Sequence, residues 1–312
     1  MGHKTILDLN HYGFYELLKQ IKKNCEQINP HETLEEIKYR DFINFIRSCK
    51  QFQVLFYMWD KVLYRRLFIP YLTFASDVYI DFDELYTRLN SFTPKIKETY
   101  YRSVYLAIQE NENLKTVELK YHAEKYYSEH MEVFSFVMNE LRKKKSIEVL
   151  KLDNPVYTID DLSGFGNLIE LILHARVDVE EFCRCCSNNR NLRKLTVLSN
   201  DLMGGRLANI AQYCSQVRRF EFEMKPDCDA SEYAPLAKMS MLEQLKISGV
   251  HEPGTLKPLF QALANRQSKA FTILSIDNAL LNFEDTTALS QIELLRDLRC
   301  GFVDPQTYVQ NS

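Results

Sequence analysis

The densest group of metal-binding residue types in this sequence is Cys183, Cys185 and Cys186. Closely spaced thiolates can bind zinc, but a structural zinc site also needs a second pair of cysteines or histidines at a matching spacing. The sequence has no such pair beside them. Cys183 and Cys186 also fall on the apolar stripe of an expected helix, so we interpret them as core thiols and expect no metal.

Patterns that would indicate catalysis or nucleotide binding are absent from the sequence. The seven histidines are scattered singly, and none lies in a motif with a nucleophile and a carboxylate. Gly164-Phe165-Gly166 lacks a third glycine and precedes an expected strand, so it predicts a turn and not a phosphate-binding loop. We therefore expect a chain that is not an enzyme and binds no cofactor.

Composition and charge narrow the classes of partner. The 312 residues are 46% hydrophobic and 26% charged, which is typical of a folded globular chain. A net charge of −3 leaves no positive excess for nucleic acid or an anionic membrane surface. The longest apolar run, Val54 to Trp59, is far shorter than the roughly 20 residues of a membrane-spanning helix. Protein partners are the remaining expectation.

We expect the chain to be located inside the cell, in the cytoplasm or the nucleus, because its sequence lacks the features of a secreted protein. The chain begins without the charged start and apolar run of a signal peptide, and its eight cysteines show no paired spacing. The basic run from Arg142 to Lys145 is either a nuclear-import signal or the basic end of a helix, where the helix dipole favours cations.

A short block recurs along the C-terminal two-thirds of the chain, with an apolar residue followed three and five positions later by two more. Blocks begin at Ile147, Leu168, Leu192, Val217, Leu242, Phe271 and Leu295, and an earlier one begins at Leu114. From Ile147 the steps are 21, 24, 25, 25, 29 and 24 residues, around the period of leucine-rich repeats. Each block predicts a short strand whose fourth and sixth residues point into the core.

Between the blocks the apolar spacing becomes helical. Val179, Phe182, Cys183 and Cys186 show this spacing, and it returns within 207–214 and 256–263. Asp178 and Glu181 form an expected capping pair at the start of the first helix. The predicted fold class is therefore α/β, a leucine-rich-repeat solenoid over residues 114–312 with one strand and one helix per repeat.

Strand residues that alternate with the inward leucines are expected on the concave face of such a solenoid, where neighbouring strands align them in rows. The predicted target-binding residues are Glu170, Lys194, Thr196, Arg219, Glu221, Gln244 and Lys246. Among them, three cations would form a modest basic spot for an acidic segment of a target protein: Lys194, Arg219 and Lys246. A solvated face without a partner is the alternative.

Residues 1–65 precede the repeats and predict a small helical module. One apolar stripe consists of Phe14, Leu17, Leu18 and Ile21, a second of Phe42, Phe45, Ile46 and Cys49, and a third cluster of Phe52, Leu55, Phe56 and Trp59. Such a module could simply cap the open end of a solenoid. Residues 66–113 predict a connector or a degenerate repeat, with a strand around Val78 and Ile80 and a helix starting at Thr93-Pro94.

The order of residues in the N-terminal module resembles an F-box. Leu7-Asp8-Leu9-Asn10 precedes the first stripe, and Asp41-Phe42-Ile43 leads on to Cys49-Lys50-x-Phe52 and then to Leu55 and Trp59. Two features depart from the family pattern: the usual Leu-Pro is Leu9-Asn10 here, and the loop from Lys22 to Arg40 is longer.

An F-box followed by leucine-rich repeats is the layout of substrate receptors of Skp1–cullin–F-box ubiquitin ligases, and this chain looks like an irregular member of the insect type. The resemblance implies a non-catalytic adaptor that binds Skp1, and through it a cullin, and presents a target protein for ubiquitination and proteasomal degradation. It implies Skp1 contacts at Leu7, Leu9, Phe14, Leu17, Leu18, Ile21, Phe42, Phe45, Cys49, Phe52, Leu55 and Trp59. The alternative is a leucine-rich-repeat scaffold with a helical cap and no ligase.

Overall fold

The chain divides into two compact units in a computed structural model. We call Met1–Ala75 with Leu89–Glu112 the helical unit, and Ser76–Arg88 with Asn113–Ser312 the sheet unit. The structure describes residues 11–28, 30–31, 38–47, 52, 55–56, 59–60, 75–83, 85, 94–122, 128–197, 202–203, 206–224 and 232–302.

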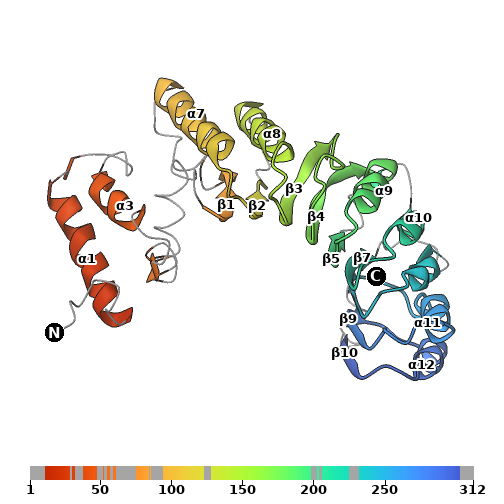
Figure 1. Cartoon of the computed structure of the whole chain (residues 1–312). Helices are drawn as coiled ribbons and strands as arrows, with labels where there is room; N and C mark the ends of the chain where they lie inside the picture. The colour runs from red at the N-terminus through yellow and green to blue at the C-terminus, as the bar shows by residue number, and fades with distance from the viewer. Residues whose placement is uncertain are drawn as a thin grey trace, which may run out of the picture. The chain divides into compact units, whose positions relative to one another are not determined.

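The helical unit contains both amphipathic helices that the sequence predicts (Figure 1). Helix α1 spans His11–Ile28, and α3 spans Arg40–Arg47. They pack against each other through their apolar stripes, in which Phe14, Leu18 and Phe42 are almost fully buried. Helix α7 spans Pro94–Glu110 and begins at the predicted proline, because the fixed φ of proline suits a first helical turn.

The sheet unit is built on a parallel sheet in which each main strand lies beside its neighbours in chain order. The strands are β1 Asp77–Asp81, β2 Thr116–Lys120, β3 Val149–Ile159, β4 Glu170–Asp178, β5 Lys194–Val197, β7 Arg219–Met224, β8 Gln244–Gly249, β9 Ile273–Ala279 and β10 Asp297–Phe302. The short β6, Leu202–Met203, pairs with β4. The fold is therefore mixed α/β with an open parallel sheet.

The register of the strands follows the apolar blocks. The fourth block positions pair across the sheet, and so do the sixth, with Leu171 beside Leu195 and Leu173 beside Val197. These residues are 1% exposed or less from β2 to β9: Val117, Leu150, Leu171, Leu195, Phe220, Leu245 and Leu274 in one row, and Leu119, Leu152, Leu173, Val197, Phe222, Ile247 and Ile276 in the other. The predicted strand positions and their inward direction are confirmed.

The two end strands of the sheet, β1 and β10, continue the pairing of the inner strands but differ from each other in the burial of their residues. β1 lies within 66–113 and pairs residue by residue with β2, so this segment contributes a strand to the sheet. At the other end, Leu298 of β10 pairs with Leu274 but is 47% exposed. Because β10 is the last strand of the described sheet, no further row covers it.

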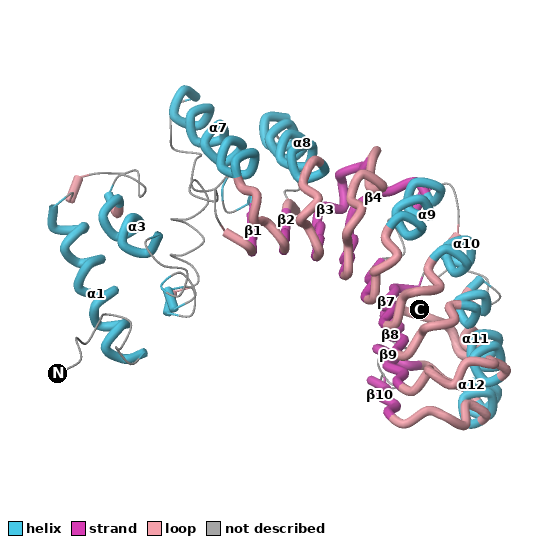
Figure 2. Tube along the Cα trace, in the orientation of Figure 1, coloured by secondary structure: helices cyan, strands magenta, loops and turns pink. Residues whose placement is uncertain are grey.

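Helices lie on one face of this sheet (Figure 2). They are α8 Ser128–Arg142, α9 Val179–Asn188, α10 Leu207–Ile210, α11 Lys257–Ala264 and α12 Phe283–Ser290, with the 3-10 helices η3 Ala211–Tyr213 and η5 Ala234–Lys238. The described part of the link from β7 to β8 holds η5 instead of an α-helix, with a proline in its first turn. In α9, Cys185 and Cys186 are fully buried while Cys183 is half-buried, so the predicted stripe is displaced by part of a turn.

Candidate functional site

Figure 2 shows helices on one face of the sheet, and we call the opposite face the helix-free face. The residues that the sequence predicts to bind a target alternate along their strands with the inward row residues, so they lie on this helix-free face. One register row runs through Glu170, Lys194, Arg219 and Gln244. The next runs through Ile172, Thr196, Glu221 and Lys246. Four consecutive strands thus bring residues up to 76 positions apart in the sequence into one two-row surface.

Two of the three cations on this surface are paired with acidic neighbours. Lys194 Nζ lies 2.8 Å from Glu170 Oε1, and Lys246 Nζ lies 2.7 Å from Glu221 Oε1 and 3.3 Å from Asp277 Oδ2. The hydrogen bond to Glu221 raises the pKa of Lys246 above its ordinary value. The prediction of a basic spot is therefore wrong, because the register places a carboxylate beside two of its three members.

Arg219 and Thr196 differ from their neighbours in accessibility. Arg219 is exposed and makes no ion pair with any residue that the structure describes. Thr196 is only 7% exposed, and its Oγ1 has no hydrogen-bond partner among the described residues. A ligand on the helix-free face would therefore meet Arg219 as an accessible cation and would scarcely reach Thr196.

The alternation of charge continues toward β1. Lys151 Nζ lies 3.5 Å from Glu118 Oε2, and Lys120 Nζ lies 3.4 Å from Asp81 Oδ2. Cross-strand pairs of this partly exposed kind stabilise a sheet by only about 0.2–1 kcal/mol each. A partner lying on this face would meet alternating charges, which favour a surface with its own mixed charges over a uniformly acidic one.

The F-box resemblance implies Skp1 contacts at twelve residues of this chain. In the helical unit, the described ones fall into a buried group and a partly buried group. Five of them form its core and are at most 8% exposed: Phe14, Leu18, Phe42, Phe52 and Leu55. Four are partly buried, namely Leu17, Ile21, Phe45 and Trp59. Leu7, Leu9 and Cys49 lie outside the described residues. Among the described ones, the partly buried four are those that a partner could contact without opening the core.

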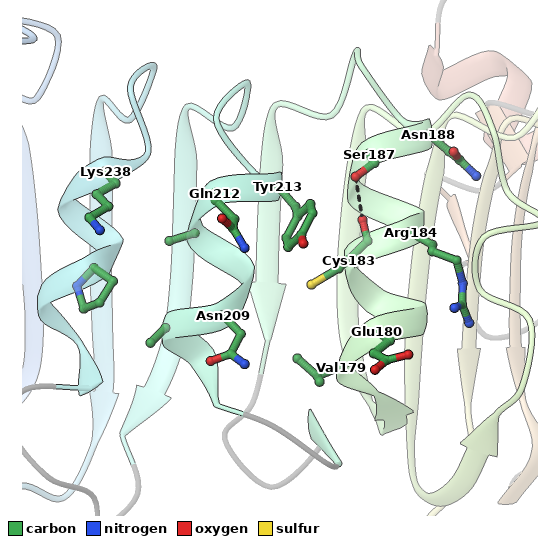
Figure 3. A pocket seen from close by; sticks show the side chains of 13 residues that line it. Val179, Glu180, Cys183, Arg184, Ser187, Asn188, Asn209, Gln212, Tyr213 and Lys238 are labelled. Carbon is green, nitrogen blue, oxygen red and sulfur yellow. Dashed lines mark hydrogen bonds between the residues drawn. The ribbon is translucent and has the colours of Figure 1, made fainter.

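A groove of about 700 Å³ lies on the helix-bearing side, between α9, the α10–η3 segment and η5 (Figure 3). Its lining combines Cys183 and Ser187 of α9 with Gln212, Tyr213 and Lys238 from the following elements. Three successive strand–helix units contribute to it, so no spacing in the sequence indicates it.

The thiols of α9 all have a raised pKa, and Cys183 is the one that lines this groove. Burial raises the pKa of Cys183 to about 11, and burial also raises the pKa of Cys185. The contact of Cys186 with Cys214, together with burial, raises the pKa of Cys186. A thiol reacts as a nucleophile through its thiolate, and the raised pKa of Cys183 keeps this form scarce at neutral pH.

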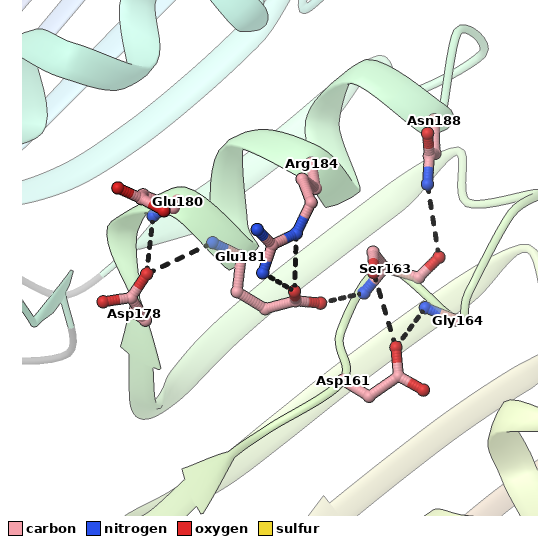
Figure 4. Close-up of polar contacts among 8 residues, drawn as sticks. All are labelled: Asp161, Ser163, Gly164, Asp178, Glu180, Glu181, Arg184 and Asn188. Atoms are coloured by element: carbon pink, nitrogen blue, oxygen red, sulfur yellow. Dashed lines mark hydrogen bonds and ion pairs between the residues drawn. The ribbon is translucent and has the colours of Figure 1, made fainter.

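A buried carboxylate connects the start of α9 with the turn before β4 (Figure 4). Asp178 Oδ1 accepts hydrogen bonds from the N–H groups of Glu180 at 2.9 Å and Glu181 at 3.4 Å, so the predicted cap is present. The Glu181 carboxylate does not complete the capping pair. It accepts from Ser163 N at 2.6 Å and from Arg184 Nη2 at 2.6 Å, which fixes the 163–166 turn against α9.

Replacing Glu181 with glutamine is expected to destabilise the sheet unit at neutral pH by about 1–3 kcal/mol, since a buried N–H loses a charged acceptor. Burial of Glu181 raises its pKa, but the hydrogen bonds from Ser163 and Arg184 outweigh this and hold the pKa below 4.5. A folded-state pKa that is lowered stabilises the protein above the unfolded-state pKa, and this stability is lost as the pH falls through the folded-state value.

The difference in unfolding free energy between wild type and Glu181→Gln should therefore shrink below about pH 4. Glu180→Gln is the control, because Glu180 is exposed on the same helical turn. Chemical denaturation at pH 7 and at lower pH measures both variants. Equal losses for the two, or a loss that does not depend on pH, would contradict the role assigned to the Glu181 carboxylate.

No family model and no curated protein matches the sequence. Among solved structures, the chain is similar to an internalin from Listeria monocytogenes, with 16% identity and a TM-score of 0.35. The match covers 63% of this chain and 63% of the internalin chain, so it spans less than two thirds of that protein. In the described part of the chain, no helix is long and apolar enough to cross a membrane.

Proposed function

We propose that the sheet unit is a leucine-rich-repeat solenoid that binds a target protein on its helix-free face, and that the chain has no catalytic role of its own. The observation that carries this proposal is the pair of in-register rows through Glu170–Gln244 and Ile172–Lys246. Such rows supply many polar contacts from a rigid framework, as protein recognition requires. The recurring block period in the sequence supports the repeat assignment.

For the helical unit we propose an F-box-like role, in which it binds Skp1 and through Skp1 a cullin. This part rests on the order of residues from Leu7 to Trp59 in the sequence. The chain would then act as the substrate-recognition adaptor of a ubiquitin ligase in the cytoplasm or nucleus. Holding a target lysine near a ubiquitin-charged enzyme raises its effective concentration, and this would be the adaptor's contribution to catalysis.

Skp1 binding is tested by titrating purified Skp1 into the full chain. Leu17→Glu places a charge on the partly buried side of α1 and should abolish binding. Ile28→Glu is the matched control, because Ile28 is 69% exposed on the same helix and is not among the implied contacts. If the folded wild-type chain shows no Skp1 binding, the ligase role is excluded and the scaffold alternative remains.

Target capture is tested separately on the helix-free face. Arg219→Glu should reduce recovery of target proteins in co-purification while Skp1 recovery is unchanged, because it reverses an exposed charge in the middle of the rows. Arg190→Glu makes the same charge change in the turn after α9 and should have little effect. Unaltered capture by Arg219→Glu would place the target site on another surface.

A further inference from the structure

Three potential metal ligands meet on the helix-free face near the start of the sheet: His122, Asp153 and His174. Asp153 and His174 are register partners on β3 and β4, and His122 follows the end of β2. His122 Nε2 lies 2.5 Å from Asp153 Oδ1, and His174 Nδ1 lies 2.7 Å from the same oxygen. The sequence does not indicate this group, because its members are 31 and 21 positions apart and belong to three different strand segments.

The backbone holds the three residues in place. Asp153 and His174 are fixed by the β3–β4 ladder, and Tyr121 N donates to Asp153 O at 2.8 Å, which extends the attachment of the chain beyond β2. The two imidazole rings lie 6.2 Å apart between centroids. Their side chains are 41% and 35% exposed, and that of Asp153 is 39% exposed, so an ion could reach the group from solvent.

The possible ligand atoms of the three residues lie close enough together for one small ion to bind all of them. One atom from each residue lies within 4.8 Å of the others. A tetrahedral zinc ion with ligands at about 2.0–2.1 Å separates its donors by about 3.3 Å. The present nitrogen–oxygen distances would lengthen by less than about 1 Å, which rotations of these partly exposed side chains can supply.

We propose that His122, Asp153 and His174 form a binding site for a divalent transition-metal ion, with zinc the ion of choice. Two imidazole nitrogens favour zinc, nickel or copper over magnesium and calcium, which take oxygen ligands. Three protein ligands leave one tetrahedral position open. The three side chains lie on the same side of the sheet as the two rows, so a water molecule or a donor atom of a bound protein could supply a fourth ligand.

Isothermal titration of Zn²⁺ into the full-length chain, free of any histidine tag, tests this site. One equivalent is expected to bind, and His174→Ala and Asp153→Asn are each expected to weaken binding by at least about tenfold. Asp153→Asn keeps the shape of the side chain, so it remains informative if His174→Ala does not fold, and circular dichroism checks both. His31→Ala removes an exposed histidine from the helical unit and should leave binding unchanged.

Two further measurements separate this site from other sources of binding. Mg²⁺ should show no saturable binding, and Co²⁺ should give visible absorption without the near-ultraviolet band of a thiolate ligand. Wild-type chain that takes up no stoichiometric Zn²⁺ overturns the proposal. So does binding that the Asp153 and His174 variants leave unchanged, or binding that disappears on alkylation of the cysteines. These outcomes are independent of whether Skp1 or a target binds.

Discussion

Leu245→Ala is expected to lower the free energy of unfolding of the sheet unit by about 2–5 kcal/mol. Leu245 has no exposed surface, and it lies in register between Phe220 and Leu274 in the inward row. Removing three carbons there leaves a cavity that neighbouring strands cannot close, because their backbones are held by parallel hydrogen bonds on both sides. Urea denaturation followed by circular dichroism measures the loss.

Leu298→Ala is the matched control for Leu245→Ala. The same substitution is made one strand beyond Leu274, in the same row, but Leu298 is 47% exposed. We expect it to cost about 1 kcal/mol or less, since much of the side chain is already in contact with water. Similar losses at the two positions would show that the inward row is not the core of this unit.

Phe42→Ala is expected to destabilise the helical unit by about 3–5 kcal/mol. Phe42 is fully buried, and its ring centroid lies 4.9 Å from that of Phe56 and 6.4 Å from that of Trp59. The unit has a small core, so the loss of one central ring removes a large share of its stability. Hydrogen exchange by mass spectrometry should show faster exchange of the amides of α1 and α3.

The control for Phe42→Ala is Tyr12→Ala, because Tyr12 is 74% exposed on α1. In the Tyr12→Ala variant, the amides of α1 and α3 should exchange as slowly as in the wild type. The amides of β3 to β8 serve as an internal reference, since they belong to the other compact unit. If Phe42→Ala left exchange in α1 and α3 unchanged, the aromatic cluster would not be what stabilises these helices.

Local patterns in the sequence predicted the strands and most helices well. A strand or helix that buries one face shows a regular apolar spacing within its own segment of the chain. Leu171 and Leu173 are buried and alternate with partly exposed residues, as the pleat of a strand requires. The stripe of Phe14 and Leu18 follows in the same way from helical spacing. The α9 cap was also predictable, since Asp178 acts on the two residues that follow it closely.

The rows across neighbouring strands were predictable from spacing, but the individual side-chain contacts between strands were not. The pairing of Lys246 with Asp277 needs the β8–β9 register, and the burial of Thr196 needs its neighbours on both sides. Glu181 was expected to complete a cap, yet it accepts a hydrogen bond from Ser163, which belongs to a preceding turn. The His122–Asp153–His174 group depends on three strand segments at once, so motif spacing could not indicate it.

The chain-order arrangement of the strands has a consequence for how events at one end of the sheet affect the other. Each main strand from β2 to β9 is hydrogen-bonded to its immediate predecessor and successor. If the sheet unit is the solenoid proposed above, its stability is close to a sum of units and nearest-neighbour interfaces. In that case a disturbance at His174 would pass through β5, β7 and β8 before it reached β9. A long ligand lying across the strands would then bind as a series of nearly independent local contacts, and its binding free energy, not its affinity, would grow in proportion to the number of strands it spans.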